Sequence, residues 1–214
     1  MFPLLALEAF VKGGPILFLL LALSLIALTL VIAANKALAL VPPSSKDYVN
    51  RLMTALDLED THDVKVFLNS RSDPYASVLK VLLGNQEKSR EIALEAATQE
   101  GIAQVNNLRK HNMVLASIAT SAPLLGLLGT IMGLISVFNV ISSTGLADNT
   151  ALAGGIAEAL LTSFGGLLVG IIFLFLLQVI RKKIENIEIK IERAFVDVLS
   201  HPKFFSRGGE EEEA

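Results

Sequence analysis

The chain of 214 residues contains no cysteine and no tryptophan, and only 18% of its residues are charged. Without cysteine, neither a disulfide framework nor a thiolate metal site can form. With 52% hydrophobic residues and a mean hydropathy of +0.58, the chain is too apolar for an ordinary soluble domain of this length. We therefore expect a membrane protein.

The sequence also lacks the motifs of nucleotide-driven and metal-dependent enzymes. No phosphate-binding G-x-x-x-x-G-K-[ST] motif occurs, and the segment 126–130 has neither the lysine nor the loop that such a motif requires. The three histidines, His62, His111 and His201, are scattered, and no H-E-x-x-H motif is present. We expect no enzymatic activity, no cofactor, no metal and no nucleic-acid partner.

Three apolar stretches are each long enough to cross a bilayer, which requires roughly 20 residues of helix. They cover residues 13–34, residues 112 to about 143, and residues 159–180, and none contains an ionisable side chain. The predicted fold class is an all-α membrane protein with three transmembrane helices. The second and third of these helices are long and extend into a cytoplasmic helical domain.

Two other interpretations of the apolar stretches are weaker. A cleavable signal peptide has an apolar core of about 7 to 15 residues behind a positive segment, whereas residues 13–34 are longer and follow both Glu8 and Lys12. A soluble protein of this length could not surround three fully apolar helices with polar layers.

Lysine and arginine predict the orientation, because they favour the cytoplasmic side of short flanks. Of the 18, all but Lys12 lie in residues 35–112 or 181–214, and the 144–157 loop has none. The N-terminus is therefore predicted to be periplasmic and the C-terminus cytoplasmic. The predicted parts are an N-terminal segment with the first helix (1–35), a cytoplasmic helical domain (36–112), a channel core (113–180), and a cytoplasmic C-terminal helix with an acidic tail (181–214).

The cytoplasmic parts are predicted to be helical. Helix starts are indicated at Ser44 or Ser45, at Asp60 or Thr61, and at Asp73 before Pro74. A longer helix is predicted from Asn85, and it can continue into the second span as one rod. Its apolar stripe consists of Leu94, Ala97, Gly101, Gln104 or Val105, and Leu108.

A second apolar stripe follows the third span. It consists of Ile180, Ile184, Ile187, Ile191, Phe195 and Val198. The two stripes can pair with each other within one chain or with neighbouring copies. The helix is predicted to end at His201-Pro202, and the glutamate run of residues 210–213 is predicted to be a solvated tail without a function.

Small residues mark the second and third spans as helices that pack closely, because membrane helices associate through small residues rather than through the hydrophobic effect. The predicted packing and partner-contact residues are Pro123, Gly126, Gly129, Gly133, Gly166 and Gly170. Hydroxyl groups are also concentrated in these two spans. We expect them to be the inner helices, and the first span to face lipid.

The motif SAPLLGLLGTIMGLISVF (121–138), followed by GGIAEALLTSFGGLLVGI (154–171), resembles the ExbB/TolQ/MotA proton-channel family, closest to its ExbB and TolQ branch. The resemblance implies a ring, commonly of five copies, in the bacterial inner membrane. Thr130 then matches the pore threonine of the second span and Glu158 the acid of the third. The third-span pore threonine falls at Ser163, with Thr162 one position earlier, so either hydroxyl can face the pore.

A proton channel needs a titratable carrier inside the membrane, but residues 113–147 and 159–180 contain no Asp, Glu, His, Lys or Arg. The acid must therefore come from another polypeptide. The resemblance implies an ExbD- or TolR-like single-span partner that carries an aspartate, and a TonB-like energy transducer for outer-membrane import. Alternatives are a TolQ-type role, a gliding or flagellar stator, and a passive membrane scaffold.

Overall fold

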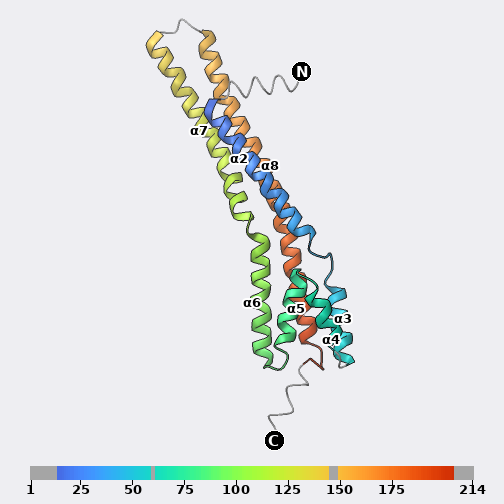
Figure 1. The fold of residues 1–214 in the computed structure, drawn as a ribbon. Coiled ribbons are helices and arrows are strands. Elements are labelled where there is room, and N and C mark those ends of the chain that lie inside the picture. Colours follow the sequence, from blue (N-terminus) through green and yellow to red (C-terminus); the bar gives the residue numbers. More distant parts are fainter. Residues whose placement is uncertain (1–13, 59–60, 145–148, 205–214) are drawn as a thin grey trace. The chain divides into compact units, whose positions relative to one another are not determined.

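The computed structural model describes residues 14–58, 61–144 and 149–204, and within these ranges it contains seven helices and no strand (Figure 1). The fold is therefore all-α, as the sequence predicts. In chain order the helices are α2 (Gly14–Ala39), α3 (Lys46–Asp57), α4 (His62–Asn69), α5 (Pro74–Gly84), α6 (Arg90–Arg109), α7 (Asn112–Thr144) and α8 (Asn149–Leu199).

Three of these helices, α2, α7 and α8, are long and apolar enough to cross a membrane, which confirms the predicted number of spans. The chain divides into two compact units, which we describe separately. Residues 1–33 and 111–179 form the membrane unit, and residues 34–110 and 180–214 form the polar unit.

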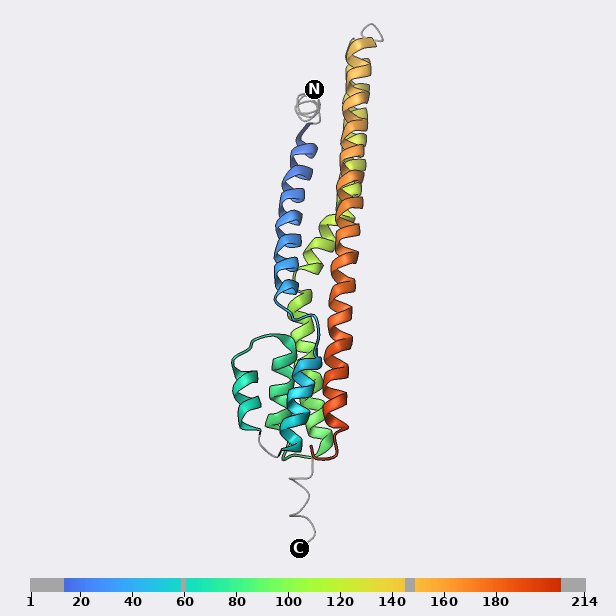
Figure 2. The ribbon, with the colours of Figure 1, turned by 90° about the vertical axis from the view of Figure 1, so that its right-hand side faces the viewer.

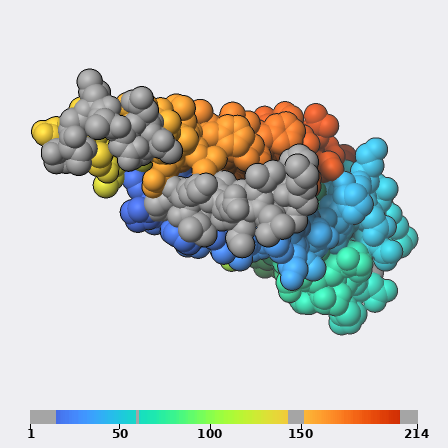
Figure 3. Space-filling model, turned by 90° about the horizontal axis from the view of Figure 1, so that it is seen from above, coloured from blue at the N-terminus to red at the C-terminus, as the bar shows by residue number. Residues whose placement is uncertain are grey.

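In the membrane unit, α2 runs alongside α7 and α8 (Figure 2), and Cδ1 of Leu17 in α2 would lie 3.0 Å from a Cβ atom at Gly165 of α8. Figure 3 shows the side chains of α2 in blue and those of α8 in orange, seen from above. The core cluster of this unit is small: Leu17 and Leu20 of α2 pack with Ala122 of α7. Most large apolar side chains point outward, for example Leu124, which is 66% exposed. Such a surface requires lipid or further helices to cover it.

The polar unit has an ordinary core of large side chains. The fully buried residues of α5, among them Tyr75, Leu79 and Leu82, form its centre. The predicted stripe on α8 is buried along its whole length, from Ile180 to Val198. A Cβ atom at Gly101 of α6 would lie 3.4 Å from Cγ2 of Ile191 of α8, so the two stripes meet within one chain.

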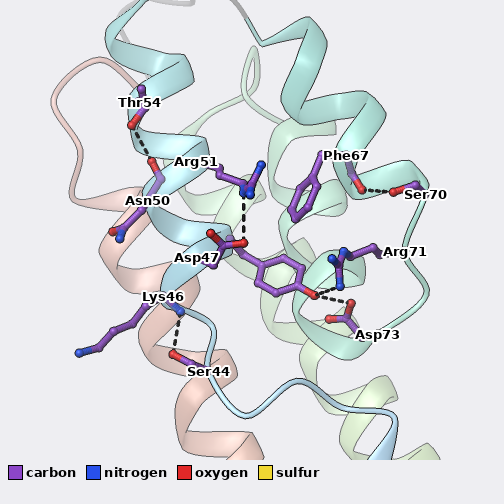
Figure 4. A network of polar contacts seen from close by, with 11 residues as sticks. Ser44, Lys46, Asp47, Asn50, Arg51, Thr54, Phe67, Ser70, Arg71 and Asp73 are labelled. Atoms are coloured by element: carbon purple, nitrogen blue, oxygen red, sulfur yellow. Dashed lines mark hydrogen bonds and ion pairs between the residues drawn. The ribbon is translucent and has the colours of Figure 1, made fainter.

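Polar contacts connect α3, α4 and α5 (Figure 4). The Tyr48 hydroxyl donates to Asp73 Oδ2 at 2.8 Å and accepts from Arg71 Nη1 at 3.2 Å. The Arg71 guanidinium also lies over the Phe67 ring, 5.0 Å from its centroid, a cation–π arrangement. Burial, followed by the hydrogen bond to Asp73, raises the pKa of Tyr48 to about 12.

The N-terminus of α5 is capped as the sequence predicts. Asp73 Oδ1 accepts hydrogen bonds from the backbone N–H groups of Tyr75 and Ala76, and Pro74 occupies the first helical position. Ser45 and Thr61 stand at the cap positions of α3 and α4 without a side-chain capping bond.

Three details of the predicted long helix are wrong. The helix begins at Arg90 rather than Asn85, because the Ser89 hydroxyl accepts from the Ile92 N–H and caps it. Leu94 is 42% exposed, and Ala93 is buried in its place. The predicted continuous rod is interrupted, since α6 ends at Arg109 and α7 begins at Asn112.

The interruption has no breaker residue, because residues 102–112 contain neither glycine nor proline. It coincides with the boundary between the two units, after Lys110. Local helix propensity alone therefore does not predict the interruption. The predicted acidic tail and residues 145–148 of the predicted external loop lie outside the described residues.

Candidate functional site

The glycines of α7 and α8 bring two helix backbones into direct contact. A Cβ atom at Gly166 would lie 2.5 Å from the Ala122 carbonyl oxygen and 2.7 Å from the Gly126 Cα atom. A Cβ atom at Gly126 would lie 3.1 Å from the Ser163 carbonyl oxygen. Because the obstructing atoms are backbone atoms, Gly166 has no room for a larger residue, and a side chain at Gly126 would require the α8 backbone to shift by a few tenths of an ångström.

The other predicted packing residues lie along the same interface. A Cβ atom at Gly129 would collide with the Thr162 side chain, and one at Gly133 would lie 2.7 Å from Ala159 Cβ. A Cβ atom at Gly170 would lie 2.5 Å from Cγ of Pro123. All six predicted packing residues therefore belong to the α7–α8 contact.

Pro123 lies inside α7, where its missing N–H leaves the Ala119 carbonyl without its usual helical donor. The same carbonyl would be 3.1 Å from a Cβ atom at Gly170. Because Gly170 has no side chain, α8 can lie directly against both the Pro123 ring and the Ala119 carbonyl of α7.

Thr130 connects the two helices through its hydroxyl. Its Oγ1 lies 3.2 Å from the Ala159 carbonyl oxygen of α8 and 3.3 Å from the Gly126 carbonyl oxygen of its own helix. A hydroxyl has only one proton to donate, so these two carbonyls share it. Thr130 is half-buried, and its hydroxyl lies at the seam between the two helices.

Thr162 and Ser163 differ sharply, although they are neighbours. Thr162 is 3% exposed, donates to the Glu158 carbonyl oxygen at 2.9 Å, and lies with its methyl group against Gly129. Ser163 is half-buried and lies with its backbone against Gly126. Within the described part of the chain, no hydrogen bond involves the Ser163 hydroxyl. Of these two side chains, Ser163 is the more exposed.

A cavity of about 200 Å³ opens between α2, α7 and α8. It includes Glu158, whose side chain is exposed, and Ser136, a hydroxyl outside the predicted site. In the sequence, the only signal for Ser136 is that the second span contains several polar residues. The cavity is lined by Pro15, Ile16, Gly129, Met132, Gly133, Ser136, Gly155, Glu158, Ala159 and Thr162. Among the described residues, no group of three His, Asp or Glu side chains could hold a metal ion.

Three helices long and apolar enough to cross a membrane, two of them packed against each other through glycines, are typical of a membrane protein. Comparison with known proteins agrees. The MotA/TolQ/ExbB proton channel family matches residues 69–193, which is more than half of the chain. The chain belongs to this family.

Individual relatives are biopolymer transport proteins. The chain is 31% identical over 180 residues to the ExbB-like 1 protein of Synechocystis, covering 81% of this chain and 70% of the relative. A second Synechocystis protein, ExbB-like 3, is 44% identical over 92 residues, 42% of either chain. An ExbB homolog of Methanothermobacter thermautotrophicus is 29% identical over 191 residues, 87% of this chain and 66% of the relative. The chain thus spans between 42% and 70% of the length of these relatives.

Proposed function

We propose that this protein is the channel subunit of an ExbB/ExbD-type motor in a bacterial inner membrane, which converts the proton-motive force into work on an envelope-spanning partner. In this proposal several copies, in the family's usual number five, form a ring. The N-terminus is periplasmic and the C-terminus cytoplasmic, as the lysine and arginine distribution favours.

The observation that carries the proposal is a pair of packed helices with hydroxyls but no acid at membrane depth. Residues 113–147 and 159–180 contain no ionisable side chain. Proton transfer through a bilayer nevertheless requires a titratable group, so a partner must supply it. A single-span protein that carries a transmembrane aspartate meets this requirement.

The hydroxyls have geometry that suits a neutral lining. Thr130 already shares its proton between two carbonyls, so its oxygen lone pairs stay available to accept a hydrogen bond from a protonated carboxyl or from water. Ser163 is the half-buried hydroxyl of α8. We propose that Thr130 and Ser163 contact the partner's aspartate or its waters, that Thr162 supports the helix pair, and that Glu158 stands near the membrane surface.

The outward faces of the membrane unit support assembly. Large apolar side chains of α7 and α8, such as Leu124, Leu128, Phe164 and Ile171, are exposed in the single chain. In a ring they would pack against neighbouring copies, the partner's helix or lipid.

The test is reconstitution. The chain is copurified with candidate single-span proteins encoded beside it, and proton flux into liposomes is followed with a pH-sensitive dye. Flux is expected only with a partner, and its loss is expected when the partner's aspartate is replaced by asparagine. Vigorous proton conduction by this chain alone would refute the proposal, and assembly without any flux would favour the passive scaffold.

A matched pair of variants tests the lining. Thr130→Val removes the hydroxyl at the α7–α8 seam, whereas Thr29→Val removes an exposed hydroxyl of α2 that only bonds back to the Ile26 carbonyl. The first substitution is expected to reduce flux at least tenfold, the second to leave it unchanged, and both to leave assembly intact. Equal flux in both variants would remove Thr130 from the pathway.

A further inference from the structure

A second cavity, of about 440 Å³, lies within the polar unit, where the first span ends. Its lining includes Ala37 in the last turn of α2, and Leu40 and Val41, which follow that helix. The rest of the lining comes from the start of α5 with the segment before it and from α6. Lys36 lies in the same last turn of α2, and a charged side chain avoids the hydrocarbon core of a membrane. This end of α2 is therefore expected to lie in the headgroup layer.

Part of the lining is apolar. Leu40 is 81% exposed, Ala37 and Val41 are half-buried, and Leu108 of α6 belongs to the same cavity. Covering such side chains with hydrocarbon is favourable, because their apolar surface is then removed from water. The glycerol end of a lipid and its first acyl carbons could provide this cover.

The polar part of the lining offers free hydrogen-bond donors and a positive charge. In the described part of the chain, the exposed Arg71 guanidinium makes one hydrogen bond, from Nη1 to the Tyr48 hydroxyl at 3.2 Å, and no ion pair. A guanidinium has five N–H groups, so most of its donors are free. The Ser72 hydroxyl and the Asn107 amide are also exposed and make no hydrogen bond within the described ranges.

The acidic residue of the lining, Asp73, does not cancel this positive charge by pairing with it. Its Oδ1 accepts from the backbone N–H groups of Tyr75 and Ala76, and its Oδ2 accepts from the Tyr48 hydroxyl at 2.8 Å. Both carboxylate oxygens are therefore engaged in holding α3 and α5, whereas the Arg71 donors stay available.

The Arg71 guanidinium is also held in position by two aromatic rings. Its Cζ atom lies 5.0 Å from the centroid of Phe67 and 5.5 Å from that of Tyr48. The hydrogen bond to Tyr48 adds to this support, as Figure 4 shows. A fixed guanidinium with free N–H groups suits a phosphate, whose oxygens it can bind in a bidentate manner.

We propose that this cavity binds a phospholipid from the membrane leaflet at this end of α2. The phosphodiester oxygens accept hydrogen bonds from Arg71, Ser72 and Asn107. The glycerol and the first acyl carbons lie against Leu40 and Val41. A free phosphate would use the polar donors alone and leave the apolar side chains in water, so the lipid is the occupant that fits the whole lining.

Photocrosslinking tests the site directly. The full chain in nonionic detergent is mixed with phosphatidylglycerol that carries a diazirine on the acyl carbons next to the glycerol, and crosslinked peptides are identified by mass spectrometry. Crosslinks are expected in residues 37–41 or at Leu108. They are also expected around Leu25, which is 57% exposed on α2 and needs no headgroup contact. Crosslinks around Leu25 without any in the cavity would overturn the proposal.

A matched pair of arginine variants tests the phosphate contact. Arg71→Gln removes the positive charge of the cavity, whereas Arg51→Gln removes an arginine that lies 4.6 Å from the same Phe67 ring but does not line the cavity. Relative to the yield around Leu25, the first substitution is expected to reduce the crosslink yield in residues 37–41 about fivefold or more, and the second to leave it unchanged. Equal yields would refute the role of Arg71.

Leu40→Glu tests the same contact without removing a packed side chain, since Leu40 is 81% exposed. The introduced carboxylate repels the phosphodiester, so the crosslink yield at Val41 and Leu108 should fall about fivefold or more. This variant remains informative if Arg71→Gln fails to fold. An unchanged yield in Leu40→Glu would contradict a phosphate in the cavity.

Two further ligands separate a lipid from a free phosphate. Diacylglycerol with the same diazirine lacks the phosphate and is expected to crosslink around Leu25 but not in the cavity. Inorganic phosphate at millimolar concentration is expected to leave the cavity crosslinks of phosphatidylglycerol unchanged. Competition by phosphate would assign the cavity to a free anion, and equal labelling by diacylglycerol would assign it to acyl chains alone, and either result would overturn the proposal. Ion flux is not measured in these experiments, so failure of the channel proposal does not alter their outcome.

Discussion

The helices inside each of the two units pack together in different ways. In the polar unit, large side chains fill the space between helices, and α5 alone buries Tyr75, Leu79 and Leu82. In the membrane unit, α7 and α8 meet where side chains are missing, as at Gly126 and Gly166. The difference follows from the solvent: water expels apolar side chains into a core, whereas lipid does not distinguish a leucine on a helix from its own chains.

The polar contacts differ in the same way. Side-chain hydrogen bonds and ion pairs join separate helices of the polar unit, for example between Tyr48 and Asp73 and between Arg109 and Glu188. In the described part of the membrane unit, the side-chain contact between helices that stands out is the Thr130 hydroxyl on the Ala159 carbonyl. Polar groups within membrane spans are rare, so Thr130 and the cavity that contains Glu158 are the candidates for a functional role in this unit.

The largest expected effect is on the side-chain core. Leu79→Ala removes a side chain with no exposed surface and should destabilise the polar unit by about 2–5 kcal/mol, because a cavity is left behind. Leu124→Ala, on the exposed face of α7, should change stability by less than about 0.5 kcal/mol. Thermal unfolding followed by circular dichroism measures both. Equal losses would contradict the proposed difference between the units.

The second prediction concerns the contact between α7 and α8 that their glycines allow. Gly166→Ala adds one methyl group against the backbone of α7 and should cost about 1–3 kcal/mol, because those backbone atoms cannot move aside. Gly154→Ala adds the same group on the same helix with nothing within 4 Å, so it should be neutral or stabilise by up to about 1 kcal/mol. Circular dichroism melts in detergent compare the two. A stable Gly166→Ala would show that the close contact is not required.

The sequence predicts this fold well wherever a pattern repeats. Apolar runs predicted the three spans, and three-to-four spacing predicted the buried stripe from Ile180 to Val198, because both depend on periodicity within one helix. The break at Lys110 and the exposure of Leu94 were not predictable in this way, since they depend on how separate helices pack.

The candidate site shows the same limit. Spacing placed Gly126, Gly133 and Gly166 on close-packing faces, because small residues have that role in membrane helices. Spacing could not decide between Thr162 and Ser163, which differ only in the direction they point. It also gave no sign that Ser136 shares a cavity with Glu158, because such a cavity exists only once three helices are in place.

A third prediction concerns alkaline pH. Burial raises the pKa of Tyr75 to about 12, as it does for Tyr48, whereas an unfolded tyrosine has a pKa near 10. Below pH 10 both states keep their protons and the full stability is present. Between about pH 10 and 12 the unfolded state releases phenolic protons that the folded state retains, so stability should fall as pH rises through this window.

The variant Tyr48→Phe separates this effect from the titration of lysines. It keeps the ring contact with Phe67 but has no proton to lose. Its melting temperature should fall less steeply from about pH 9 to 11 than that of the unmodified protein. Parallel curves for the two proteins would show that Tyr48 does not contribute to the alkaline loss.

The smallest expected effect is at the surface of the polar unit, where Arg109 Nη2 lies 2.6 Å from Glu188 Oε2 and connects α6 to α8. Both side chains are roughly half exposed, so water and salt screen the pair. Glu188→Gln should therefore cost no more than about 0.5 kcal/mol at low salt and less at high salt. A loss above 1 kcal/mol that persists in high salt would mean that this pair belongs to the interior of a larger assembly. The stability of the polar unit would then depend on neighbouring copies, as that of the membrane unit is expected to do.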